Sequence, residues 1–226
     1  PNTEVDVSVN LTAPATNGTH KGNWKMRAPD GTVFGFGVSG GNASIFVQII
    51  VGPTPTPGPQ SKTFSPSSDG SARSNNSTGN APVAGDTAAD VGSQAFLTFD
   101  ISSIPDDADI QKVSLDLGNA PVIEGDPFGD LGCLRVYPDQ YGSLSSGDYT
   151  PPPVNSSGWR FCTENQMDDS DEQEGNSTAL DAFEDALSDD NFQVRIQFNE
   201  METDSDGTED SVGFASIRLR VVYLED

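Results

Sequence analysis

Residues 94–117 read QAFLTFDISSIPDDADIQKVSLDL, which is two alternating apolar runs joined by a corner at Pro105. The apolar positions share one face of each run, and they are Ala95, Leu97, Phe99 and Ile101, then Val113, Leu115 and Leu117. Polar residues occupy the opposite face: Thr98 and Asp100, then Lys112, Ser114 and Asp116. This period of two is typical of a half-buried antiparallel strand, because successive side chains point to opposite faces. The stretch therefore predicts two central strands of an all-β sandwich.

The chain is strongly acidic, with 35 Asp and Glu against 11 Lys and Arg and a formal net charge of -24. Such a surface repels nucleic acid and anionic membranes, so we expect neither as a partner. No apolar run approaches the ~20 residues that would span a bilayer, so no membrane insertion is expected. Three situations would explain this excess of carboxylates: a surface kept soluble at high salt, a protein that binds divalent cations, or a solvated acidic coat. The last is the simplest of the three.

Two cysteines, Cys133 and Cys162, lie too far apart and are too few for a four-ligand zinc site. In an exported chain they would form one disulfide, worth roughly 3 to 4 kcal/mol in the chain-entropy model. The alternative is a pair of buried free thiols in a cytosolic protein. The composition favours the disulfide and an extracellular or cell-surface location. We expect the chain, which starts at Pro1, to be a mature or trimmed piece whose export signal lies upstream.

The first 51 residues predict four strands of a small domain. Residues 4–12 alternate, residues 20–27 place Trp24 and Met26 inward, residues 33–36 form a short strand, and residues 45–51 form a nearly continuous apolar strand. The turn Pro29-Asp30-Gly31 precedes the third strand, because Pro presets φ and Gly accepts positive φ.

Three blocks carry a resemblance to the C-terminal half of the four-tryptophan domain. They are VSVNLTAP (7–14), GTHKGNWKMRAPDG (18–31) with a following Phe34-Gly35, and FVQIIV (46–51). That family is an immunoglobulin-like sandwich of autophagy cargo receptors and many bacterial surface proteins. The resemblance implies a partial immunoglobulin-like domain without catalytic chemistry. Of the naming tryptophans only Trp24 is present, and the family's first half is missing.

The missing half has a physical consequence, since four strands cannot cover both faces of a sandwich and leave unpaired edges. Either upstream residues complete the domain, which is the simpler hypothesis, or a neighbouring chain does. The second hypothesis would make the molecule a polymer subunit that assembles by strand addition, with a homo-oligomer or neighbouring surface-protein domains as partners.

Residues 52–60 form a Pro/Thr-rich linker that stays near polyproline II and acts as a stiff spacer. Residues 61–226 are predicted to form a jelly-roll β-sandwich with one short helix over residues 177–187. Leu180, Phe183 and Leu187 share one stripe of that helix, and Asn176 or Ser177 caps its start.

This larger domain resembles the DNRLRE-type jelly-roll modules of large exported bacterial and archaeal proteins. The likeness is carried by FLTFDISSIP (96–105), IQKVSLDL (110–117) and IRLRVVY (217–223). It implies a carbohydrate-binding, structural or adhesive module. The signature motif that names the family is not recognisable in this sequence.

No catalytic arrangement stands out in the sequence. The one histidine, His20, has no Ser or Cys motif nearby and is interpreted as an ordinary surface residue. A pair of carboxylates could hydrolyse glycosides, but nothing in the spacing singles out a pair. We therefore expect a protein that is not an enzyme.

The best ligand cluster lies in EMETDSDGTED (200–210). Glu202, Asp204 and Asp206, followed by Gly207, imitate the oxygens and the turn of a calcium loop, with Asp210 as a further ligand. The EF-hand pattern fails, because Gly213 stands where the bidentate acid belongs. The alternative is a charged hairpin tip without metal, so calcium is the one cofactor considered.

The sequence thus predicts an exported, non-catalytic structural or adhesive surface protein, with a subunit of an extracellular fibre or surface array as its specific form. The alternative is a carbohydrate-binding module of a larger secreted enzyme. An exposed aromatic platform formed by Tyr141, Tyr149 and Trp159 would favour that alternative.

Overall fold

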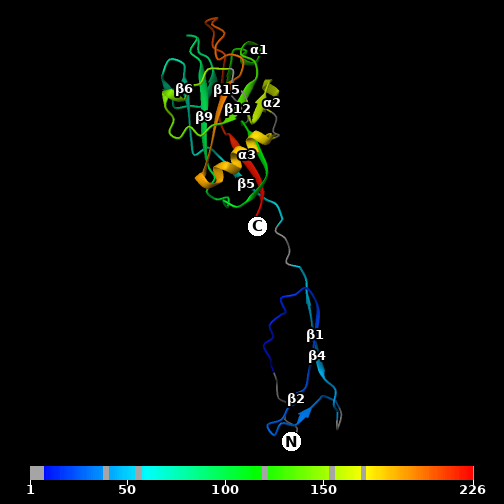
Figure 1. Cartoon of the computed structure of the whole chain (residues 1–226). Helices are drawn as coiled ribbons and strands as arrows, with labels where there is room; N and C mark the ends of the chain where they lie inside the picture. The colour runs from blue at the N-terminus through cyan, green and yellow to red at the C-terminus, as the bar shows by residue number, and fades with distance from the viewer. Residues whose placement is uncertain are drawn as a thin grey trace. The chain divides into compact units, whose positions relative to one another are not determined.

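The computed structural model describes residues 8–37, 41–53, 58–118, 122–152, 156–168 and 172–225 (Figure 1). The chain divides into two compact units, unit 1 over residues 1–56 and unit 2 over residues 57–226. The division falls inside the Pro/Thr-rich segment 52–60. Both units are built from strands, so the all-β fold class is confirmed.

Unit 1 consists of two separate antiparallel ribbons in the part that the structure describes. Strand β1 (Gly18–Trp24) pairs with β4 (Ile45–Val51), and β2 (Met26–Arg27) pairs with β3 (Val33–Phe34). The expected turn is present, since Gly31 N donates to Ala28 O at 2.9 Å and Gly31 has a φ of 92°.

The strand predicted over residues 4–12 is wrong for residues 8–12, which form no strand, while residues 1–7 lie outside the described part. A strand needs a partner for its backbone N–H and C=O groups, and within the described part of unit 1 no segment forms a strand pairing with residues 8–12.

Unit 1 buries none of its described residues. The expectation that Trp24 points into a core is wrong, because its side chain is 44% exposed and Met26 is only half-buried. Nine of the ten exposed large hydrophobic residues that the structure describes belong to this unit. They are Val9, Leu11, Trp24, Val33, Phe34, Phe36, Ile45, Phe46 and Ile50. No second layer covers these side chains within the described residues.

Unit 2 contains two antiparallel sheets. The smaller has the order β14 (Gln173–Glu174), β10 (Asp109–Asp116), β17 (Arg218–Leu224) and β5 (Gln60–Phe64). The larger runs through β11 (Val122–Glu124), β16 (Ser211–Gly213), β8 (Val83–Gly85), β9 (Ser93–Asp100), β15 (Asn191–Phe198), β12 (Leu134–Pro138) and β13 (Trp159–Phe161). Strand β6 (Ser68–Arg73) pairs with β9 and with β7 (Thr78–Gly79).

The two strands of the opening stretch lie in different sheets, β9 in the larger and β10 in the smaller. Their apolar residues belong to one hydrophobic core, in which Leu97, Phe99, Leu115 and Leu117 are at most 1% exposed. The corner between them is held by Ile101 N, which donates to Asp190 O at 2.8 Å. The two-layered sandwich built around residues 94–117 is therefore confirmed.

The second face of β9 is buried, which differs from the half-buried strand expected from alternation. Phe96 and Gln94 are fully buried, and Thr98 is 8% exposed. The segment 139–152 covers this face: the Tyr141 ring packs edge-on against Phe96, and Thr150 N donates to Gln94 Oε1 at 3.0 Å. Alternation cannot reveal a loop that returns over a sheet, because Gln and Thr read as solvent-facing residues.

The predicted helix is α3 (Ser177–Ala186), capped by Asn176, whose side chain accepts hydrogen bonds from Thr178 N and Ala179 N. Phe183 is fully buried beneath it. The helix packs against β10 and β12. The described residues also form α1 (Pro127–Asp130), α2 (Glu164–Asp168) and the 3-10 turns Ser146–Asp148 and Leu187–Asp189. Single turns carry no apolar period, so the sequence did not predict them. No described helix is long and apolar enough to cross a membrane.

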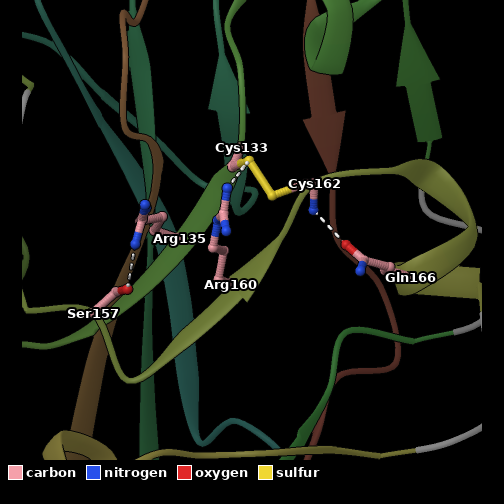
Figure 2. Close-up of a disulfide and its surroundings, with 6 residues drawn as sticks. All are labelled: Cys133, Arg135, Ser157, Arg160, Cys162 and Gln166. Atoms are coloured by element: carbon pink, nitrogen blue, oxygen red, sulfur yellow. Dashed lines mark hydrogen bonds between the residues drawn. A yellow bond between two sulfur atoms is a disulfide. The ribbon is translucent and has the colours of Figure 1, made fainter.

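Cys133 and Cys162 form a disulfide, which confirms that prediction (Figure 2). They sit just outside the paired positions Leu134 and Phe161 of β12 and β13, so the sheet register brings the two sulfurs together. Arg160 donates to Cys133 Sγ at 3.1 Å, and Cys162 N donates to Gln166 Oε1. The disulfide ties the edge strand of the larger sheet to its neighbour.

A candidate metal centre at one end of unit 2

An acidic cluster forms where three segments distant in sequence meet. Carboxylate oxygens of Asp130, Asp204 and Asp210 lie within 4.8 Å of one another. Asp130 ends α1, while Asp204 and Asp210 belong to the connection between β15 and β16. Figure 1 places α1 and this orange connection at the same end of unit 2. We call these three residues the Asp130 cluster.

The backbone of β8 and β16 positions the buried part of this cluster. Gly85 pairs with Ser211, so the next residues along, Asp86 and Asp210, face each other. Asp86 N donates to Asp210 O at 2.8 Å, and Asp210 N donates to Asp86 Oδ1 at 3.0 Å. Asp86 and Asp210 are each 1% exposed. Two buried carboxylates therefore lie side by side, and one of them, Asp210, belongs to the cluster with the exposed Asp130.

The Asp130 cluster is also tied to the segment before α1. Asp126 N donates to Asp210 Oδ1 at 2.6 Å, and Thr208 Oγ1 donates to Asp210 Oδ2 at 3.2 Å. The Asp126 side chain caps α1 by accepting from Gly129 N, which orients the turn that carries Asp130. The segment before α1, which carries Asp130, is thus tied directly to Asp210.

The electrostatics of the cluster are those of carboxylates crowded together. Loss of solvation raises the pKa of Asp130, and the charges of Asp210, Asp126, Asp204 and Asp206 raise it further. Burial likewise raises the pKa of Asp86; the Thr203 hydroxyl and Asp210 N lower it in part, and the charges of Asp210 and Asp204 add to the rise. Both groups therefore lie in a negative field that favours protons or cations.

Of the predicted calcium ligands, the structure brings Asp204 and Asp210 together but not Glu202 or Asp206. Glu202 turns inward, is 3% exposed and lies 3.4 Å from Gln94 Nε2. Burial raises the pKa of the Glu202 carboxyl well above its ordinary value. Asp206 is exposed and accepts hydrogen bonds from Thr208, whose hydroxyl and N–H lower its pKa. The expectation that all four residues form one loop site is therefore wrong, because successive side chains in the connection point in different directions.

Asp130 and Asp86 were missed as ligand candidates by sequence reasoning. In the sequence, Asp130 lies 70 residues before the acidic stretch 200–210, and Asp86 lies more than 100 residues before it. No local spacing links them to Asp204. Only the pairings of β8 and β11 with β16 place them at one site.

The residues expected to form an aromatic platform do not form one. Trp159 is 3% exposed, packs edge-on against Phe192 and donates from Nε1 to Gln173 O at 3.1 Å. Tyr141 packs against Phe96, and its hydroxyl lies 2.7 Å from Thr98 Oγ1. Tyr149 is half-buried, and burial, with the nearby Glu202 charge, raises its pKa to about 12. The expectation of Trp159 as an exposed platform residue is wrong, since its alternating strand turns it into the core.

His20, the single histidine, is half-buried on β1, and its Nε2 lies 2.8 Å from Thr16 O. The structure describes no Ser, Cys or carboxylate within hydrogen-bond reach of it.

We expect Gly85→Ala to destabilise unit 2 by about 3 kcal/mol or more. Gly85 has a φ of +116°, and an added Cβ would lie 2.1 Å from the carbonyl oxygen of Asp210. The strand pairing that positions Asp86 and Asp210 would have to separate. Urea unfolding followed by circular dichroism measures the effect.

The matched control is Gly142→Ala. Gly142 also has a positive φ, +72°, but an added Cβ would meet nothing within 4 Å. It should cost only about 1 kcal/mol for the left-handed backbone. Equal losses for the two variants would contradict the close approach at Gly85.

Comparison with known families gives a match to the first part of the chain. Unit 2 is a two-sheet antiparallel sandwich, and unit 1 contributes two ribbons of a second β domain. Residues 1–51 match the family model described as an Ig-like domain from next to BRCA1 gene. The match spans 51 of the 226 residues and is similar in extent to unit 1. The chain matches none of the curated proteins with which it was compared.

Proposed function

We propose that the chain is an exported, non-catalytic structural or adhesive protein, and that unit 1 is completed by a strand from a second copy to build an extracellular fibre or surface array. The observation that carries this proposal is the apolar surface of unit 1. Its described residues include nine exposed large hydrophobic side chains and none that is buried. An isolated surface of this kind is unstable in water.

One face of unit 1 has the features of a strand acceptor. This face contains an apolar groove. Its lining includes Val9, Leu11, Trp24, Met26, Phe36, Ile45 and Val47. Strands β1 and β4 pair only with each other among the described residues, so each has one open edge. An added strand would satisfy those backbone groups and place alternate side chains in the groove.

Two further observations support an exported structural role. The disulfide in unit 2 is typical of proteins that mature in an oxidising compartment. The Pro/Thr-rich segment 52–60 favours an extended spacer between successive modules. The resemblance of residues 61–226 to DNRLRE-type jelly-roll modules of exported proteins agrees with this role. The carbohydrate-binding alternative has less support, since unit 2 exposes no Trp or Tyr among its described residues.

Size-exclusion chromatography and negative-stain microscopy of the full chain test the proposal. We expect concentration-dependent oligomers or fibres. Ile45→Lys should weaken association at least tenfold, because Ile45 is 48% exposed within the groove and its burial is worth about 1.5–3 kcal/mol.

The matched control is Gln48→Lys, which adds the same charge to β4 at an exposed position that does not line the groove. This variant should assemble like the wild-type chain. A wild-type chain that stays monomeric at all concentrations, with unit 1 folded, would overturn assembly between copies and leave completion by upstream residues of a longer polypeptide.

A further inference from the structure

We propose that unit 2 binds one Ca²⁺ ion at the Asp130 cluster, with carboxylate oxygens of Asp130, Asp204 and Asp210 as ligands and Asp86 as a fourth from behind. This site differs from the loop site expected from residues 200–210. It does not use Glu202 or Asp206, and it includes Asp130 and Asp86 from other segments. It is independent of the assembly proposed for unit 1.

The geometry supplies oxygen ligands from three directions. One carboxylate oxygen from each of Asp130, Asp204 and Asp210 lies within 4.8 Å of the other two, which is compatible with ligation of a single ion. Ca²⁺ binds oxygens at about 2.3–2.6 Å, so two ligands on opposite sides lie about 5 Å apart. The three carboxylates can therefore contact one cation without rearrangement of the strands.

Asp86 provides a second, independent observation. Its Oδ1 accepts from Asp210 N, and the Thr203 hydroxyl acts on the same carboxylate, but the buried Oδ2 has no hydrogen-bond partner within the part of the chain that the structure describes. The residue is 1% exposed, and the charges that act on it come from Asp210 and Asp204. A buried carboxylate oxygen without a donor is costly, and a bound cation beside these two aspartates would remove that cost.

The ligand set favours calcium over other metals. The three residues of the Asp130 cluster and Asp86 all offer carboxylates, which are hard oxygen ligands. Among the described residues, no His or Cys belongs to this cluster. Magnesium requires close to ideal octahedral geometry, whereas calcium accepts the irregular arrangement that three separate segments produce. The formal charge of -24 adds a general attraction for cations, which the test must separate from a specific site.

Calcium at this position would join α1, the end of β8 and the connection between β15 and β16. Because these segments separate on unfolding, the site would exist only in the folded state. Binding would therefore stabilise unit 2 by mass action.

The test is calorimetric titration and thermal unfolding of the full chain after treatment with a chelator. We expect one Ca²⁺ per chain and a melting temperature that rises by about 5–10 °C at a hundredfold excess over the dissociation constant. Magnesium at the same concentration and ionic strength should give a much smaller rise.

Asp130→Asn should lower calcium affinity at least tenfold. Asp130 is exposed and lies at the end of a short turn, so the variant is expected to fold. Asp206→Asn is the matched control: it removes the same charge from the acidic connection at a residue outside the Asp130 cluster. It should change the affinity less than threefold. No calcium-dependent heat or melting shift, equal stabilisation by magnesium, or equal loss in the two variants would each overturn the proposal.

Discussion

Trp159→Ala is expected to lower the free energy of unfolding of unit 2 by about 3–5 kcal/mol. The indole is 3% exposed, contacts Phe192 edge-on at a centroid distance of 6.4 Å, and donates from Nε1 to Gln173 O. Truncation would leave a cavity in the core beside α3 and leave the Gln173 carbonyl without its donor.

The other tryptophan of the chain provides the control. Trp24 is 44% exposed in unit 1, so Trp24→Ala should leave the unfolding of unit 2 unchanged. That variant also leaves Trp159 as the single indole, whose fluorescence then reports on unit 2 during urea unfolding. If Trp159→Ala left stability unchanged and instead abolished binding on a glycan array, the carbohydrate-binding alternative would replace the structural one.

Replacing Cys133 and Cys162 together by serine is expected to lower the stability of unit 2 by about 3–4 kcal/mol. The bond closes a loop with a sequence separation of 29 residues, and its loss increases the entropy of the unfolded chain. The loop contains β13 and the segment 139–152 that covers the outer face of β9.

Urea unfolding of the wild-type chain and the double variant, each with and without a thiol reductant, measures this effect. The reductant should destabilise only the wild-type chain, and the reduced wild-type chain should match the double variant. If the double variant kept wild-type stability, the disulfide would be a local link with no effect on the cooperative core.

The sequence predicted the inner core of unit 2 well, because the core obeys a local rule. Val113 and Leu115 on β10 alternate with polar residues, and both are at most 2% exposed. The same rule was wrong for the other face of β9, where Thr98 lies under Tyr141. Burial of that face depends on a loop 40 residues further along the chain, and no periodicity records it.

In unit 1, the sequence predicted one strand that the structure contains and one that it does not contain within the described residues. The nearly continuous apolar run of β4 predicted a strand, and the structure contains it. Residues 8–12 alternate between apolar and polar side chains but form no strand, since alternation specifies which face would be buried and not whether a partner is present. The exposed apolar side chains therefore became visible only in the structure.

For the candidate site, the sequence singled out two of the three residues of the Asp130 cluster, and the calcium ion itself stays a proposal. Asp204 and Asp210 lie in the stretch singled out, Asp130 joins them from another segment, and the pairing of β8 with β16 places Asp86 beside Asp210.

The amino-acid sequence alone determined the strand class, the division near residues 52–60, the helix at α3 and the pair of cysteines, since each depends on neighbours within a few residues or on a count. The tertiary structure decided which carboxylates meet, that Trp159 lies in the core, and that β9 is covered on both faces. These outcomes depend on contacts between segments tens of residues apart, and side-chain order along the chain does not encode such distances in any local pattern.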